Sequence, residues 1–266
     1  MTPASPTPAH LAQLLALSAV QPFSRSTFLP GFKKAFMNLH FKHLAAALTI
    51  FLAAFYGAAH AESPMVTDDA STLNAQGAKL EAGVFKSGPS RSRALSFSYA
   101  PVENLELGLG YAQLRDRSTS PETRNTSHGI AAKWIPLHQG PVSAGFKLEI
   151  ARTGETSAAA SQRSTALTGL LSYQGSPAYG LHANLGRERS RSAVTDPVNS
   201  TRWAVGAEFA IAQNVQLTGD LFGASGTAPG KQVGLRWTLK EGCKLFGAMG
   251  RSNGENLASA GIAWEF

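Results

Sequence analysis

Apolar and polar residues alternate along most of the sequence after residue 76, and this period constrains the fold more than any other feature. In residues 142–150, Val142 and Phe146 fall on one face of an extended chain, whereas Lys147 and Glu149 fall on the other. Successive side chains of a strand point to opposite sides, so this pattern predicts strands that each have one apolar face.

Twelve such strands are predicted, and most are about ten residues long, which is the length that a tilted strand needs to cross a bilayer. They cover residues 77–86, 91–100, 105–115, 126–136, 141–152, 163–173, 179–187, 201–210, 215–223, 231–239, 243–251 and 257–266.

The connections between the predicted strands alternate in length. The short ones are residues 101–104, 137–140, 174–178, 211–214 and 240–242, and the long ones include residues 116–125, 153–162, 188–200 and 224–230. Outer-membrane barrels have short periplasmic turns, long outer loops and an even number of strands. We therefore predict an all-β fold, a transmembrane antiparallel up-and-down β-barrel of about 12 strands over residues 77–266. The alternative is a soluble lipocalin-like barrel with its apolar face inside, because periodicity alone does not identify the interior.

The last residues of the chain support the membrane version. Ile262, Trp264 and Phe266 lie two apart and share one face, with Glu265 on the other. A terminal aromatic residue after alternating apolar residues resembles the signal by which the barrel-assembly machinery recognises outer-membrane proteins. We expect these three residues to face lipid and the last strand to pair with the first, since unpaired backbone groups in hydrocarbon are costly.

The region before the barrel has the layout of an export signal. Residues 37–61 begin with Met and contain Lys42, an apolar run, and the small residues Ala59 and Ala61 at a predicted cleavage site. A cleaved signal peptide implies export, here to the outer membrane of a Gram-negative bacterium. Residues 1–36 are interpreted as an extension from a misassigned start, and residues 62–76 as a polar lead segment in the periplasm. Whether that lead segment enters the barrel lumen stays open.

Composition excludes two other classes of protein. The formal net charge of +7 would suit nucleic-acid binding. However, Arg25, Lys33, Lys34 and Lys42 all lie in the first 61 residues, which contain no Asp or Glu, so we expect no nucleic-acid partner. A single cysteine, Cys243, excludes an internal disulfide and a cysteine-rich metal site.

Charged residues on the polar faces are the candidate functional residues, because they would point into the lumen and set its selectivity. They are Glu81, Glu106, Lys133, Lys147, Glu149, Glu208, Asp220 and Arg236. Small inward residues such as Gly206 and Gly234 would leave space between them. No metal ligands and no cofactor are predicted.

Two further motifs can each be interpreted either as a functional site or as ordinary polar surface. Arg187, Arg189 and Arg191 would lie at the start of the longest outer loop, where they either bind lipopolysaccharide phosphates or are simply solvated. His182 and Asn184 share a polar face and, with a serine, could imitate the catalytic residues of an outer-membrane phospholipase. We favour the interpretation that they are polar residues of the lumen, because their spacing is not distinctive and no nearby serine is singled out by the sequence.

Several stretches resemble a known family. These are residues 67–81 (TDDASTLNAQGAKLE), residues 98–108 (SYAPVENLELG), Lys133-Trp134 and residues 152–154 (RTG). They are similar to the transporter-like outer-membrane barrels of the MetA pathway of phenol degradation, although Ala100 stands where that family usually has glycine. The resemblance covers about the first half of the barrel, and it implies passage of small, aromatic or hydrophobic compounds.

The sequence thus predicts a passive channel for small solutes without enzymatic activity. Its expected partners are outer-membrane lipid and lipopolysaccharide, the barrel-assembly machinery and small solutes. The main alternative is a non-conducting structural or surface-binding barrel, and a more distant one is an outer-membrane hydrolase.

Overall fold

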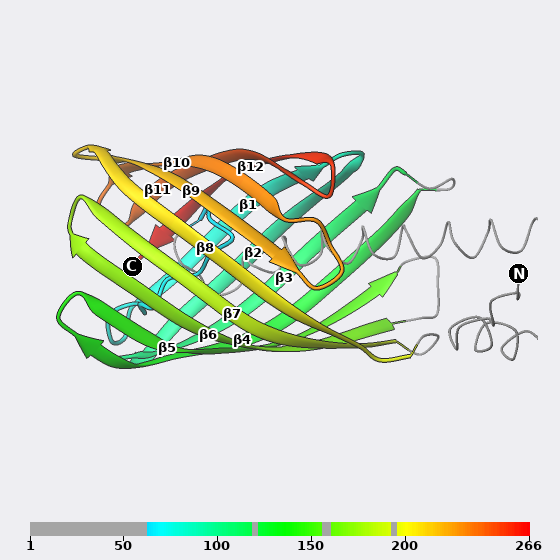
Figure 1. Cartoon of the computed structure of the whole chain (residues 1–266), viewed down its shortest axis with the longest axis horizontal. Coiled ribbons are helices and arrows are strands. Elements are labelled where there is room, and N and C mark those ends of the chain that lie inside the picture. Colours follow the sequence, from blue (N-terminus) through cyan, green and yellow to red (C-terminus); the bar gives the residue numbers. More distant parts are fainter. Residues whose placement is uncertain (1–62, 119–121, 156–160, 193–195) are drawn as a thin grey trace, which may run out of the picture. The chain divides into compact units, whose positions relative to one another are not determined.

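The computed structural model describes residues 63–118, 122–155, 161–192 and 196–266. Within these ranges, twelve antiparallel strands close into one barrel in which each strand pairs with its neighbours in the chain and β1 pairs with β12 (Figure 1). The predicted all-β up-and-down barrel is therefore confirmed. The strands are β1 (Ala78–Ser87), β2 (Ser90–Val102), β3 (Leu105–Asp116), β4 (Thr123–Gln139), β5 (Val142–Glu155), β6 (Ser161–Ser176), β7 (Tyr179–Ser192), β8 (Val198–Ala212), β9 (Val215–Ala224), β10 (Gly230–Lys240), β11 (Cys243–Ser252) and β12 (Glu255–Glu265).

The apolar face of the strands is the outer face. Leu109 and Leu185 expose 58% and 65% of their surface, whereas Glu106 and Lys133 on the polar face expose 2% and 0%. A water-soluble lipocalin-like barrel would have the opposite arrangement. A continuous apolar exterior of this extent is instead what a hydrocarbon environment requires. The described residues contain no helix that is long and apolar enough to cross a membrane.

Aromatic side chains surround the barrel near its short turns. Trp134 on β4 lies directly opposite Phe146 on β5, and Tyr179 on β7 lies opposite Phe209 on β8, all of them exposed on the outside. Such a girdle is characteristic of the membrane–water interface of transmembrane barrels. These aromatic residues therefore mark where the short-turn end of the barrel would meet the lipid headgroups.

The strands extend further toward the long-loop end than the alternation predicts. β7 continues to Ser192 and β8 begins at Val198, with Ser190 still opposite Val198. The expected position of the arginine cluster at the start of a long loop is therefore wrong. Arg187, Arg189 and Arg191 lie on the outer face of β7, because the hydrogen-bonded ladder continues beyond the region where the sequence alternates between apolar and polar residues.

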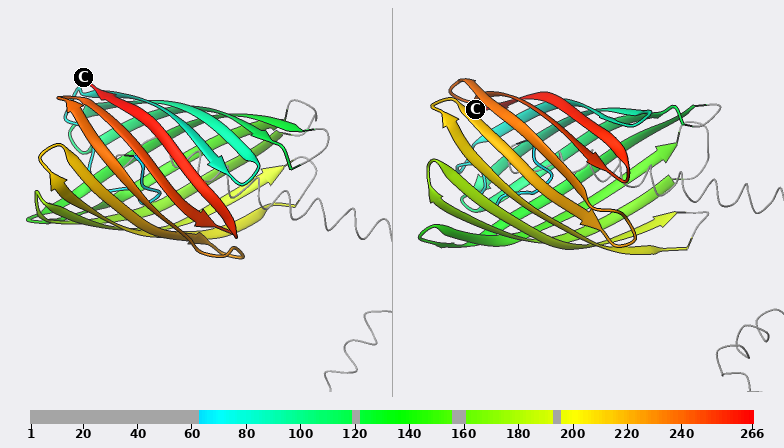
Figure 2. Two further views of the ribbon diagram at one scale, coloured as in Figure 1. Left: turned by 90° about the horizontal axis from the view of Figure 1, so that it is seen from above. Right: turned by 45° about the horizontal axis from the view of Figure 1, so that its top comes forward.

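The polar lead segment lies inside the barrel rather than outside it. Residues 63–76 run within the wall of strands (Figures 1 and 2) and make hydrogen bonds to inward-facing side chains of several strands. We call Ser63–Gln76 the plug. The segment can lie there because its own polar groups match a polar lumen. The predicted extension 1–36 and signal peptide 37–61, with Ala59 and Ala61, lie outside the described residues.

The last residue completes the closure of the barrel. The Phe266 amide donates to the Ala78 carbonyl at 2.9 Å, and the Ala78 amide donates to the Phe266 carbonyl at 2.8 Å. The Phe266 side chain is 70% exposed on the outside and contacts the ring of Trp264 edge-on.

Replacing Phe266 with alanine is expected to lower the amount of assembled barrel several-fold, while export itself continues. The side chain supports nothing in the interior, so a loss of assembly would point to the predicted terminal signal rather than to interior packing. Deleting β12 should abolish assembly, because β1 and β11 would then present unpaired edges to lipid. The measurement is heat-modifiable gel mobility in outer-membrane fractions. Phe209→Ala, which removes another exposed aromatic residue, is the control, and an equal loss in both variants would argue against a terminal signal.

Candidate functional site

The plug follows the inner wall of the barrel, and residues at both ends of the plug make hydrogen bonds to the wall. At its start, the Ser63 hydroxyl donates to Glu81 of β1, and Arg236 Nε of β10 donates to the Ser63 carbonyl at 3.0 Å. At its end, the Leu73 amide donates to Glu106 of β3 at 3.2 Å. Between these two ends, the Asp68 amide donates to Asn184 of β7, so the plug contacts strands on different sides of the lumen.

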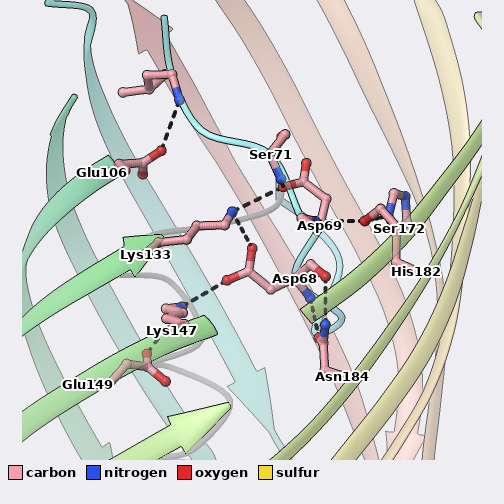
Figure 3. Close-up of polar contacts among 12 residues, drawn as sticks. Asp68, Asp69, Ser71, Glu106, Lys133, Lys147, Glu149, Ser172, His182 and Asn184 are labelled. Atoms are coloured by element: carbon pink, nitrogen blue, oxygen red, sulfur yellow. Dashed lines mark hydrogen bonds and ion pairs between the residues drawn. The ribbon is translucent and has the colours of Figure 1, made fainter. Parts of the chain in front are cut away.

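Asp68 lies at the centre of the strongest contacts (Figure 3). Its two carboxylate oxygens each accept from a lysine: Oδ1 from Lys133 of β4 at 2.8 Å, and Oδ2 from Lys147 of β5 at 3.0 Å. Lys133 also donates to Asp69 at 3.0 Å. Asp68, Lys133 and Lys147 are all buried, so the attraction between them is screened less than it would be at a surface.

Asn184 of β7 fixes the backbone of the plug at the same residue. Its side-chain oxygen accepts from the Asp68 amide at 2.6 Å, and its side-chain NH₂ donates to the Asp68 carbonyl at 2.7 Å (Figure 3). This two-point contact replaces the pairing that a neighbouring strand would offer. Because both backbone groups of Asp68 are hydrogen-bonded, the cost of removing this peptide from water is offset.

A serine, a histidine and a glutamate come together beside the plug. Ser172 of β6 lies directly opposite His182 of β7, and its Oγ is 2.8 Å from His182 Nδ1. His182 Nε2 is 3.8 Å from Glu208 of β8. The Ser172 hydroxyl also accepts from the Ala70 amide of the plug at 2.7 Å. The group contains the residue types of a hydrolase, but its hydroxyl is occupied by the plug, so its observed role is to support Ala70.

Inward glycines provide the space in which the plug lies. A β-carbon at Gly206 would be 2.3 Å from the Met65 methyl group and 2.8 Å from Thr67 Oγ1. One at Gly234 would be 2.5 Å from Pro64 Cγ. The small inward residues do leave room in the lumen, and in this structure the plug fills that room.

Two small apolar clusters complete the contacts. Val66 of the plug packs with Ala204 and Phe222, and Ala70 packs with Ile135 and Leu170. Most of the remaining contacts are polar. The plug is therefore held mainly by groups that water could solvate if it left.

A second set of ion pairs joins charged side chains of the wall to one another. Glu149 contacts Lys147 at 3.2 Å and Arg202 at 3.5 Å, and Arg202 contacts Glu188 at 3.0 Å. These residues come from β5, β7 and β8 and alternate in sign. Glu208 similarly contacts Arg236 at 2.9 Å.

The structure places all eight sequence-predicted lumen charges on the inner face, where they fall into two groups. Those that contact the plug are Glu81, Glu106, Lys133, Lys147, Asp220 and Arg236. Those that contact only wall residues are Glu149 and Glu208. The sequence analysis missed Ser172, Glu188 and Arg202. Inward alternation could have identified Ser172 and Arg202, since Arg202 lies within the strand predicted over residues 201–210, whereas Glu188 was hidden by the loop expected over residues 188–200.

Other predicted residues are not part of this site. Arg187, Arg189 and Arg191 are exposed on the outer face, and Ile262 and Trp264 are also outside. Within the described ranges, no group of three or more His, Cys, Asp and Glu side chains is arranged to hold a metal ion.

The barrel is similar to solved outer-membrane porins and channels. An outer-membrane channel from Pseudomonas putida F1 gives a TM-score of 0.56 at 9% identity, covering 74% of this chain and 98% of that one. The KdgM porin gives 0.53 at 10% identity, covering 71% and 99%, and the KdgM porin in complex with disordered oligogalacturonate gives 0.52 at 11%, with the same coverage. No protein-family model and no curated protein matches the chain. At these identities the likeness establishes the fold.

Proposed function

We propose that this protein is a passive outer-membrane channel for small solutes that is closed at rest by the plug. The proposal rests on the contacts that hold the plug in the lumen. Asp68 bridges two wall lysines, and the surrounding contacts are hydrogen bonds and ion pairs rather than an extended apolar core. A segment held in this way can leave its position and be solvated, which opens the lumen without disturbing the strands.

The size and polarity of the lumen support small solutes. Barrels of eight strands are filled by side chains, and barrels of 16–18 strands enclose open water channels, so a twelve-stranded barrel lies between these limits. Once the plug has moved, charges of both signs would face the solute. The resemblance to the phenol-degradation barrels adds the proposal that an aromatic compound is transported, and the polar wall favours one that carries polar groups.

The remaining proposals concern location and catalysis. Export through a cleaved signal peptide and insertion by the barrel-assembly machinery would place the protein in the outer membrane. We assign no enzymatic activity, and we propose that the Ser172–His182 contact serves to hold the Ala70 amide of the plug. The rival function is a non-conducting barrel that acts through its outer surface.

Reversing the charge of lumen cations is expected to change conductance and ion selectivity together. Lys147→Glu would place a third carboxylate beside Asp68 and Glu149, and Arg236→Glu would place one beside Glu208, so each should favour release of the plug and passage of cations. The measurement is conductance and reversal potential of the refolded protein in planar bilayers. Lys240→Glu, an exposed residue near the short turns, is the control.

Two results would count against the channel. Selectivity that ignores both reversals would show that these side chains do not line the pathway. Absence of conductance and of solute uptake into liposomes, in the wild type and in a protein without the plug, would favour the surface-binding alternative.

A further inference from the structure

Basic side chains occupy the outward face of the strands toward the long-loop end of the barrel. We call this set the cationic belt, and its members are Lys86, Arg91, Arg93, Arg115, Arg124, Arg152, Arg163, Arg187, Arg189, Arg191, Lys231 and Arg251. They come from β1–β7, β10 and β11. The three arginines of β7 are therefore one part of a larger feature.

Strand register places like charges directly opposite one another in this belt. Arg163 of β6 lies between Arg152 of β5 and Arg191 of β7. Like charges in directly opposite positions destabilise a sheet.

A second row repeats the arrangement on the first four strands, and it runs from Lys86 through Arg91 and Arg115 to Arg124. Lys231 and Arg251 form a further opposite pair on β10 and β11. The recurrence of such pairs along separate strands indicates that the belt faces a source of negative charge.

The protein itself supplies little of that negative charge. Glu122 contacts Arg115 at 2.6 Å and Arg124 at 3.1 Å, and the hydrogen bond from Arg115 holds the pKa of Glu122 below its usual range. Within the described part of the chain, six other belt arginines make neither an ion pair nor a hydrogen bond with their side chains: Arg91, Arg93, Arg163, Arg187, Arg189 and Arg191.

The belt directly follows the apolar exterior. Arg93 is the next outward residue after Leu95, Arg152 follows Ile150, and Lys86 follows Val84 in the same way. Two residues of a strand span about 7 Å, so each cation lies one short step beyond the hydrocarbon-facing surface. This is the depth at which lipid headgroup charges are found.

Surface grooves combine the cations with apolar residues. One groove of about 870 Å³ is lined by Lys86, Arg91 and Arg93 together with Val84 and Ala260. Another of about 710 Å³ is lined by Arg152 and Arg163 together with Ile130 and Ile150. Each could therefore accept an acyl chain and an anionic group of the same molecule.

We infer that the cationic belt binds phosphorylated, acylated lipid of the outer leaflet, with phosphates on the arginines and acyl chains on the adjoining apolar surface. Guanidinium groups bind phosphate through paired hydrogen bonds and keep their charge at all relevant pH values. The bound phosphates would also remove the repulsion between opposite arginines. This role is independent of the proposed channel.

The test compares lipid binding by the refolded full-length protein and its belt variants. Nanodiscs of phosphatidylcholine would contain a minor fraction of diphosphoryl lipid A, or of the same lipid after removal of its phosphates. Bound lipid is counted by native mass spectrometry. Each cation near an anionic surface contributes about a fivefold gain in affinity. Arg163→Gln should therefore lower the affinity for diphosphoryl lipid A about fivefold, and the triple variant Arg152→Gln, Arg163→Gln, Arg191→Gln should lower it about a hundredfold.

Matched controls separate charge from other effects. Arg163→Lys keeps the charge and should lose less than Arg163→Gln, and Lys240→Gln at the short-turn end should bind as the wild type does. Plug-free conductance should be the same with and without the triple substitution. Equal binding of the dephosphorylated lipid, or full displacement by inorganic phosphate, would overturn the assignment to a lipid phosphate, as would wild-type binding by the triple variant.

Discussion

Deleting Ser63–Leu73 is expected to raise the mean conductance of the barrel by roughly one to three orders of magnitude. A closed state that is favoured by a few kcal/mol leaves about 0.1–10% of molecules open, and deletion of the plug makes the open state the only one. The deletion keeps Asn74–Gly77, whose turn leads into β1. The strands should still close, because their backbone ladders do not involve the deleted residues. Single-channel recording in planar bilayers measures the change, and heat-modifiable mobility verifies that the barrel is folded.

A substitution can test the same point without shortening the chain. Gly206→Leu would place a side chain where Met65 and Thr67 now lie, so it should displace the plug and raise conductance. Gly219→Leu is the matched control, because Gly219 shares the outward face of β9 with Leu217 and Leu221, and a β-carbon there would lie 3.8 Å from the Gln232 carbonyl oxygen. Equal conductance of the wild type, the deletion and Gly206→Leu would show that the plug does not obstruct the pathway.

Replacing Lys133 with methionine is expected to release the plug while the barrel remains folded. Lys133 is fully buried and donates to Asp68 and Asp69, so its loss removes one of the lysines that neutralise Asp68 and the lysine that neutralises Asp69. Removing one partner of a buried ion pair costs about 3–5 kcal/mol. The lower value corresponds to roughly a hundredfold increase in the released fraction, since each 1.4 kcal/mol is a factor of about ten.

The effect should appear in the plug and not in the strands. Once released, Asp68 and Asp69 are hydrated, so the penalty acts on the equilibrium between bound and released plug. Limited proteolysis and hydrogen exchange of residues 63–76 measure that equilibrium, and thermal loss of heat-modifiable mobility measures the barrel. The double variant Asp68→Leu, Lys133→Met should destabilise the bound plug by less than the sum of the two single variants. In the double variant, neither Asp68 nor Lys133 leaves a charge that has lost the other as its partner. Lys240→Met is the control. Unfolding of the barrel with an unchanged plug would instead assign Lys133 to the stability of the wall.

Strand boundaries were predictable only where the two faces of a strand meet different surroundings. Residues 141–152 alternate because one face meets hydrocarbon and the other the polar lumen, and β5 covers that range. At the long-loop end both faces are polar, so alternation in composition stops although the ladder continues. This is why Glu188–Ser192 were assigned to a loop. Most members of the cationic belt lie at the ends of predicted strands, and only the register of the strands shows that they are neighbours.

The sequence by itself determined the class of fold, the strand number and the set of charges that share one face of the strands, because these depend on local period and on short connections. Only the tertiary structure decided which face is the interior and where residues 63–76 lie. The plug has no periodic pattern, and its contacts join residues as far apart as Asp68 and Asn184. Such contacts exist only after closure and register have brought distant strands around one lumen, where a buried carboxylate is stable because two wall lysines meet it.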